Sequence, residues 1–232
     1  MKDFSTLESK LSINFKNKEL LAQAFCHRSY INENPDFSPG HNERLEFLGD
    51  AVLELVVTEH LYNNYPIESE GNLTSWRAAL VNTKILAGIS KELEFDNFIL
   101  LSRGEASEVG RTKQSLLADT FEAVIGAIYL DGGYNPCKTF IERYLIVRLP
   151  QILKLGLHRD AKSKFQESAQ SKSGVTPSYK VLRESGPDHQ KVFVLGVLIG
   201  DEMIAQGEGY SKQEAEESAA RKALEIKGWD NN

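Results

Sequence analysis

Apolar residues recur at helical spacing through the first part of the chain, residues 5–152. In the series Leu45, Leu48 and Val52 they fall three or four positions apart, which places them on one face of an α-helix. Two-residue alternation, which would indicate a strand, is nearly absent there. This part of the chain is therefore predicted to be all-α.

The pattern changes near Gly156. A polar stretch is followed by a short helical segment, residues 161–171, and then by three strand-like runs, SYKVLRES, KVFVLGVLI and EMIAQGEG. Helical spacing returns at 211–227, so the predicted order is α-β-β-β-α, an α+β module. We therefore expect a multidomain chain with an all-α domain at residues 1–156, a short mobile linker at 157–160 and a second domain at 161–230.

Two helix starts carry the same capping signal. Ser5 is followed three residues later by Glu8, and Ser211 is followed in the same way by Glu214. In such a capping box each side chain accepts a hydrogen bond from a backbone N–H at the start of the helix. We expect helices to begin at both positions.

The overall charge argues against a nucleic-acid partner at first sight. The chain has a formal net charge of −6 and a pI near 5.5, whereas nucleic-acid binders usually carry a basic patch. Counting Lys, Arg, Asp and Glu, residues 1–156 have a net charge of −5 and residues 157–232 a net charge of −1. The acidity is concentrated in the helical part, where carboxylates that hold cations would still permit a polyanionic substrate.

Nothing in the sequence indicates export or membrane insertion. The first ten residues, MKDFSTLESK, contain no apolar segment, and the longest apolar runs are shorter than a membrane helix requires. Cys26 and Cys137 lack a CxxC spacing, which favours free buried thiols in a reducing compartment over a disulfide. We expect a cytoplasmic protein with no membrane association.

Two helical segments carry carboxylates on one face. Glu43, Glu46 and Asp50 are spaced by three and four residues, and Asp119 and Glu122 also stand three apart. At 3.6 residues per turn, each set lies along one side of its helix.

The surroundings of the second set decide how these acids are interpreted. Acids at helical spacing are usually a solvated face, but no Lys or Arg occurs between Gln114 and Cys137, and Phe121 and Val124 make the same helix strongly apolar. Buried carboxylates without a local partner are costly unless they are protonated, paired or bound to a cation. We therefore predict a site for a hard divalent ion, Mg²⁺, with Mn²⁺ as a substitute.

A divalent ion held by carboxylates is typical of phosphoryl transfer, because the ion activates a bound water and neutralises charge on the leaving oxygen. No protein nucleophile is then required. The chain contains no G-x-S-x-G elbow, no Walker A loop and no H-E-x-x-H zinc helix, and its histidines show no ligand spacing.

The two acidic segments resemble the hallmark motifs of the ribonuclease III family. The runs are HNERLEFLGDAVL and SLLADTFEAVIGAIYLDGG, and the resemblance extends to FCHRSYINE and GRTKQSLLAD. It implies an all-α ribonuclease III endonuclease domain with no small-molecule cofactor. By this match the metal ligands are Glu46, Asp50, Asp119 and Glu122, and the two most critical for hydrolysis are Asp50 and Glu122.

The same resemblance implies further site residues and a homodimer. Glu43 and Glu70 match supporting acids near the site, although a surface acid before a helix explains Glu70 equally well. Phe47 matches a residue that packs across the family's dimer interface, with ordinary core packing as the alternative. A two-fold pair would bring one acid set to each strand of a duplex.

The C-terminal part resembles a double-stranded-RNA-binding domain through its α-β-β-β-α order and the runs PSYKVL, GPDHQKVF and GEGYSKQEAEESAARKAL. Such domains recognise A-form shape through 2′-hydroxyl and phosphate contacts. Gly207 and Gly209 would allow close backbone approach. By the match, the RNA-binding residues are Ser163, Gln166, His189, Gly209, Ser211 and Lys212.

The second helix of this module departs from the family pattern. Family members commonly add lysines after the first one, whereas Gln213 follows Lys212 here, and Glu216 and Glu217 come one turn later. Each missing phosphate contact lowers affinity and salt dependence. We therefore predict weak RNA binding by this module alone.

Taken together, the sequence predicts a homodimeric, Mg²⁺-dependent endoribonuclease that hydrolyses both strands of double-stranded RNA. The family resemblance implies 5′-phosphate products with short 3′ overhangs, and roles in rRNA precursor processing and RNA turnover. Two alternatives stay open: a non-catalytic RNA-binding relative, which the intact acids disfavour, and an unrelated all-α metal phosphohydrolase, which the C-terminal module disfavours.

Overall fold

The computed structural model describes residues 2–105, 111–156, 161–187 and 191–229. The chain divides into two compact units, Met1–His158 and Arg159–Asn232, and each is described by itself. The predicted linker at 157–160 lies outside the described residues.

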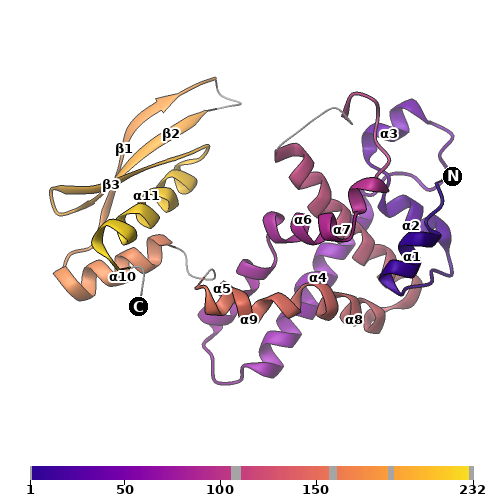
Figure 1. Ribbon diagram of the computed structural model, residues 1–232, viewed down its shortest axis with the longest axis horizontal. Helices are drawn as coiled ribbons and strands as arrows, with labels where there is room; N and C mark the ends of the chain where they lie inside the picture. Colours follow the sequence, from indigo (N-terminus) through magenta and orange to yellow (C-terminus); the bar gives the residue numbers. More distant parts are fainter. Residues whose placement is uncertain (1, 106–110, 157–160, 188–190, 230–232) are drawn as a thin grey trace. The chain divides into compact units, whose positions relative to one another are not determined.

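The first unit is helical, as the apolar spacing predicts (Figure 1). The short 3₁₀ helices η1 (Phe95–Asn97) and η3 (Ile146–Arg148) connect longer elements. The α-helices are α1 (Ser5–Leu11), α2 (Lys18–Ala24), α3 (Arg28–Glu33), α4 (Glu43–Asn64), α5 (Glu70–Leu80), α6 (Thr83–Glu92), α7 (Arg111–Gly132), α8 (Tyr134–Tyr144) and α9 (Leu149–Lys154).

Helices α4 and α7, of 22 residues each, form the centre of this unit. Along α7 the side chains of Phe121, Val124 and Ile125 are completely buried, and along α4 those of Leu53 and Val56 are too. Helices α2, α6 and α8 pack around α7 and cover its other sides. Because both central helices are held by this core, side chains near their crossing are fixed in position.

The predicted capping box at the N-terminus is wrong. Helix α1 begins at Ser5, but no side chain caps it, and the Ser5 N–H donates to the carboxylate of Asp3 instead. Glu8 accepts hydrogen bonds from the backbone N–H of Phe15, at 2.8 Å, and from Lys18. Glu8 therefore fastens the segment that joins α1 to α2, a contact that short-range spacing does not reveal.

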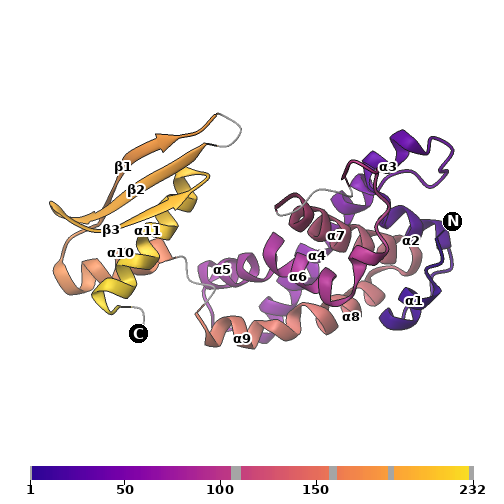
Figure 2. The same cartoon turned by 45° about the horizontal axis from the view of Figure 1, so that its top comes forward.

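The second unit has the predicted α-β-β-β-α order (Figure 2). The antiparallel sheet has the order β1-β2-β3, with Tyr179 opposite Val197 and Val197 opposite Ala205. Both helices lie on one face of the sheet, where the buried Phe165 ring stacks on Trp229 with centroids 5.5 Å apart. The elements are α10 (Ala161–Ser173), β1 (Ser178–Ser185), β2 (Val192–Ile199), β3 (Glu202–Gly209) and α11 (Lys212–Lys227).

The start of α11 shows the capping that the sequence predicts. The Ser211 hydroxyl accepts from the Glu214 N–H at 3.1 Å, and the Glu214 carboxylate accepts from the Tyr210 N–H at 2.8 Å.

In the part of the chain that the structure describes, no helix combines the length and apolar character needed to cross a membrane.

Candidate active site and RNA-binding surface

Helices α4 and α7 touch backbone to backbone at two glycines. A Cβ atom added to Gly49 would lie 1.8 Å from the carbonyl oxygen of Glu122, and one added to Gly126 would lie 2.2 Å from the carbonyl oxygen of Leu45. Contacts this short leave room only for hydrogen. The two acid-bearing helices therefore approach as closely as their backbones permit.

This close approach brings three carboxylates together, which we call the acid cluster: Glu46 from α4, with Asp119 and Glu122 from α7. One carboxylate oxygen of each lies within 4.8 Å of the others, and all three residues are half-buried. Oxygen donors at this separation match the needs of a hard divalent ion, which binds carboxylates at about 2.0–2.6 Å. The donors therefore fit the predicted metal site.

Burial and mutual repulsion favour protonated carboxyl groups in the acid cluster. Burial, followed by the charges of Asp50, Asp119 and Glu46, raises the pKa of Glu122 to about 8. Burial, followed by the charges of Asp119, Glu43 and Asp50, also raises the pKa of Glu46. Without a cation, Glu122 would hold a proton near neutral pH, and a divalent ion would supply the missing positive charge.

Asp50 borders the cluster. Its side chain is exposed one turn after Glu46, and its charge raises the pKa of both Glu46 and Glu122. The structure thus brings three of the four predicted ligands into one group and leaves the fourth within electrostatic range. Metal binding by the four remains a prediction.

Two neighbours of Asp119 were not anticipated from the sequence. Burial raises the pKa of Asp119, and this is opposed by a hydrogen bond from the Ser115 hydroxyl, at 3.3 Å, and by the charge of His27. When its ring is neutral with the proton on Nε2, His27 also caps α3, because its Nδ1 then accepts from the Ser29 N–H at 3.2 Å. The segment containing His27 was part of the family resemblance, but its spacing gave no reason to place it near α7.

The two supporting acids differ in their surroundings. Glu43 is exposed at the start of α4, with Arg28 at 3.6 Å and His41 at 3.7 Å, and its charge raises the pKa of Glu46. Glu70 is exposed at the start of α5, where its carboxylate accepts a hydrogen bond from Thr74 in its own helix. Only Glu43 has an electrostatic effect on the acid cluster.

The glycines at the crossing are the site residues that sequence analysis missed. Neither Gly49 nor Gly126 carries chemistry, so neither was a candidate. The available signal was a glycine in the interior of a strongly helical segment, which costs about 1 kcal/mol relative to alanine and so indicates a packing or functional reason.

Phe47 is not a core residue. Its side chain is 82% exposed on α4, directly after Glu46, and Leu55 is 56% exposed two turns later. The interpretation as ordinary core packing is therefore wrong. An exposed aromatic ring beside a functional site is typical of an interaction surface.

In the second unit, four of the six predicted RNA-contacting residues are Ser163, Gln166, His189 and Lys212. Ser163 and Gln166 are exposed on α10. Lys212 is the first residue of α11, and its ammonium lies 3.6 Å from the Glu184 carboxylate and above the Phe193 ring. His189 lies outside the described residues.

Glu216 and Glu217 have a structural use. The Glu217 carboxylate accepts from the backbone N–H groups of Ala161, at 2.9 Å, and Lys162, at 3.3 Å, and so caps the N-terminus of α10. Glu216 forms a 2.6 Å salt bridge with Lys162. These acids fasten α10, which carries Gln166, to α11.

Gly207 and Gly209 allow a close backbone approach, and the structure shows what approaches. A Cβ atom at Gly207 would lie 2.1 Å from the Ala219 nitrogen, and one at Gly209 would lie 2.5 Å from the Glu214 Cβ. Both glycines therefore let β3 pack directly on α11. Contact between Gly209 and RNA stays a prediction.

Comparison with known proteins gives the same division of the chain. Residues 17–149 match the family Ribonuclease-III-like, and residues 161–227 match the double-stranded RNA binding motif. Ribonuclease 3 of Borreliella burgdorferi is 46% identical over 214 residues, covering 92% of this chain and 87% of that protein. Ribonuclease 3 of Nitratiruptor sp. is 43% identical, covering 97% of each chain.

A solved structure supports the fold of the first unit. The nuclease domain of ribonuclease III from Campylobacter jejuni is 44% identical with a TM-score of 0.58, covering 66% of this chain and 99% of that one. A second structure of that domain, described as showing flexibility in a region involved in dimer formation, gives 42% identity and the same TM-score. The chain therefore belongs to the ribonuclease III family and is a double-stranded-RNA-specific endoribonuclease with a C-terminal double-stranded-RNA-binding domain.

Proposed function

We propose that this endoribonuclease depends on Mg²⁺, with Mn²⁺ as a substitute, and hydrolyses both strands of its duplex to leave 5′-phosphates and short 3′ overhangs. The observation that carries the proposal is the acid cluster, in which Glu46, Asp119 and Glu122 offer oxygens within 4.8 Å of one another at the crossing of α4 and α7. Three hard oxygen donors with no histidine or cysteine among them favour Mg²⁺ over zinc or copper.

The proposed ligands are the three residues of the acid cluster and Asp50, with Asp50 and Glu122 the most important for hydrolysis. When bound, the ion would supply positive charge that stabilises the charge developing on the scissile phosphate and lowers the pKa of a bound water.

The chain's own residues would prepare this site in two ways. The contacts at Gly49 and Gly126 hold the carboxylates of α4 and α7 at a fixed separation, so little reorganisation is required when RNA arrives. The half-buried setting of Glu122, which raises its pKa to about 8, also makes its carboxylate a strong ligand for positive charge once it is deprotonated.

We further propose that the chain acts as a homodimer. A duplex has two antiparallel strands related by local two-fold symmetry, and each chain contributes one acid cluster, so two chains would supply one site per strand. The support from this chain is Phe47, which is 82% exposed immediately after Glu46. Burial of this ring across a two-fold axis would also bring the two acid clusters towards one duplex.

The cellular role that we propose is processing of rRNA precursors and turnover of RNA in the cytoplasm. Both cysteines are free and buried, which suits a reducing compartment. Depletion of the protein should lead to accumulation of uncut rRNA precursors, measured by RNA sequencing of precursor ends. Normal precursor processing after depletion would contradict this role.

Cleavage of a long, labelled RNA duplex tests the chemistry. We expect wild-type protein to cut both strands with Mg²⁺ and not with EDTA, and Glu122→Gln to bind the duplex without cutting it. Products should become substrates for a ligase that requires 5′-phosphates. Duplex binding without cleavage by the wild type would support instead a non-catalytic RNA-binding relative, and cleavage in EDTA would refute the metal site.

A further inference from the structure

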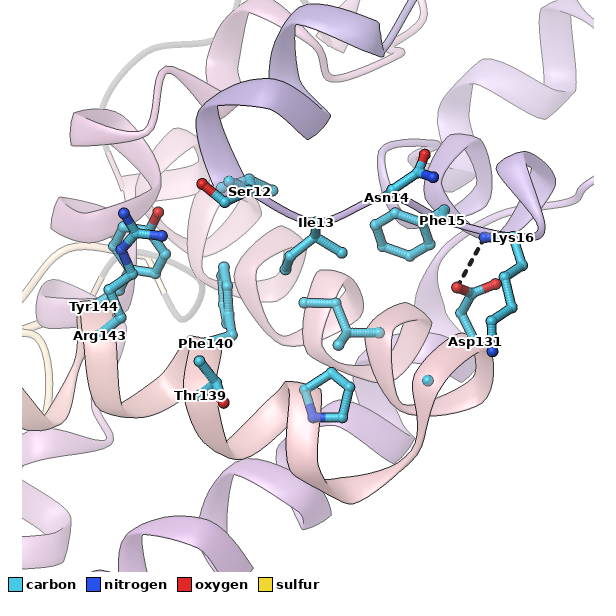
Figure 3. A pocket seen from close by; sticks show the side chains of 14 residues that line it. Ser12, Ile13, Asn14, Phe15, Lys16, Asp131, Thr139, Phe140, Arg143 and Tyr144 are labelled. Carbon is cyan, nitrogen blue, oxygen red and sulfur yellow. Dashed lines mark hydrogen bonds between the residues drawn. The ribbon is translucent and has the colours of Figure 1, made fainter.

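A cavity of about 400 Å³ lies in the first unit, apart from the acid cluster (Figure 3). It is lined by the segment that joins α1 to α2, by the C-terminal end of α7 and by α8. The lining residues of α7 begin at Ile128, six positions after Glu122, which is about 9 Å along a helix. The volume lies in the range that accepts small organic molecules.

The floor of the cavity is aromatic and aliphatic. Phe15 and Phe140 are each 2% exposed and Ile128 is 1% exposed, so their side chains are fixed by the core behind them. In the view of Figure 3 the Ile13 side chain lies between Phe15 of the joining segment and Phe140 of α8. Because these side chains are almost completely buried, the apolar surface that a ligand can reach includes instead the half-buried Ile13 and Tyr144.

Asp131 closes one side of the cavity, and both of its carboxylate oxygens accept hydrogen bonds from the backbone. One carboxylate oxygen accepts from the backbone N–H of Lys16 at 3.0 Å (Figure 3), and the other accepts from the backbone N–H of Asn17 at 2.8 Å. These bonds hold the joining segment against the end of α7. The carboxylate therefore acts as a fastener of the wall rather than as a recognition group.

Positive charge lies at the mouth. The Arg143 guanidinium is exposed 5.4 Å from the centre of the Tyr144 ring, and within the described part of the chain no carboxylate pairs with it. Its neighbours on the same stretch are paired, Lys138 with Glu59 at 3.2 Å and Arg148 with Glu92. In a domain with an excess of acids, an arginine left without a carboxylate beside an apolar cavity favours an anionic ligand.

We propose that this cavity binds a small aromatic anion, with its ring on Ile13 and Tyr144 and its acidic group on Arg143. The anion would be a phosphate, carboxylate or sulfonate, since a guanidinium binds each of these through paired hydrogen bonds. Nucleoside monophosphates and aromatic acids share this chemistry. The site is independent of duplex hydrolysis and lies outside the acid cluster.

The fluorescent probe 8-anilino-1-naphthalenesulfonate tests this proposal on the full-length protein, with adenosine 5′-monophosphate as competitor. Arg143→Ala removes the anion contact, and Thr139→Trp places a large ring in the cavity from an exposed position on α8. Thr74→Trp is the matched control, because Thr74 is also an exposed helical threonine whose hydroxyl bonds four residues back in its own helix. Circular dichroism melting shows that each variant is folded.

We expect saturable one-to-one binding by the wild type and by Thr74→Trp, about tenfold weaker binding by Arg143→Ala, and loss of this binding by Thr139→Trp. Competition by adenosine 5′-monophosphate would support the site with a nucleotide as its source. Probe binding that the variants weaken, but that adenosine 5′-monophosphate does not compete with, would support the site with an aromatic acid as its ligand. Absence of saturable binding, or equal binding by Thr139→Trp and Thr74→Trp, would overturn the proposal.

Discussion

Replacing Gly49 by alanine is the sharpest test of how the acid cluster is assembled. The added Cβ would lie 1.8 Å from the Glu122 carbonyl oxygen, against about 3.4 Å for an ordinary contact, so α4 and α7 must separate by about 1.6 Å. The atom that it meets is backbone and cannot rotate away.

Two opposing contributions set the change in the free energy of unfolding. Alanine gains about 1 kcal/mol over glycine inside a helix, whereas overpacking of a core costs about 1–3 kcal/mol and more when backbone must move. The backbone clash favours the upper end, so we expect a net loss of about 2 kcal/mol. This corresponds to a melting temperature about 4–8 °C lower for a domain of this size. A displacement of this size also predicts a loss of about 100-fold in kcat/KM for duplex cleavage.

Gly88→Ala is the matched control. Gly88 lies inside α6, and a Cβ there would meet nothing within 4 Å, so this variant should gain about 1 kcal/mol of stability and cleave normally. Melting by circular dichroism and cleavage of a labelled duplex measure both effects. If Gly49→Ala melts and cleaves like Gly88→Ala, the glycine crossing does not position the acids.

Three further predictions follow from named contacts. Because the pKa of Glu122 is raised from 4.5 to about 8, its protonated form stabilises the folded protein fully below pH 4.5, and this stabilisation is lost as the pH rises to 8. Calorimetry should therefore show that Mg²⁺ raises the melting temperature more at pH 8.5 than at pH 6. Equal shifts at the two pH values would contradict this. Glu184→Gln should free Lys212 and Lys191 and strengthen duplex binding about threefold at low salt. Glu225→Gln also removes one negative charge, on α11, and should bind like the wild type; equal titration curves for the two variants would refute the idea. Phe47→Glu should give monomers in sedimentation experiments, and a persistent dimer would exclude this ring from the interface.

Weak RNA binding by the C-terminal module stays a prediction, but the structure bases it on a different contact from the one that the sequence indicated. The sequence counted Glu216 and Glu217 as unfavourable charges near phosphate, yet they cap and pair the start of α10. The acid that pairs with Lys212, at 3.6 Å, is Glu184 of β1, which also pairs with Lys191 at 3.4 Å. Only the folded sheet brings the Glu184 side chain of β1 within 3.6 Å of the Lys212 ammonium, so no spacing along the chain could identify this pair.

The sequence by itself determined the elements and the helix faces. Periods of 3.6 and 2 depend only on local geometry, so the strands over 178–185 and 202–209 begin and end where their residue pattern predicts. The same periods place Glu46 with Asp50, and Asp119 with Glu122, on one side of their helices. The family resemblance then supplied a role for these acids.

The tertiary structure alone decided which side chains meet. The crossing at Gly49 and Gly126 sets the separation of the two acid-bearing helices. Glu8, which the sequence predicted to cap α1, instead binds the backbone of the segment before α2. Contacts between residues far apart in sequence depend on how helices pack, and packing is fixed by backbone approach and side-chain volume across the whole core. A glycine inside a helix indicates a close packing contact, but local pattern does not identify the helix that approaches it, and for this reason the acid cluster became a single site only in the fold.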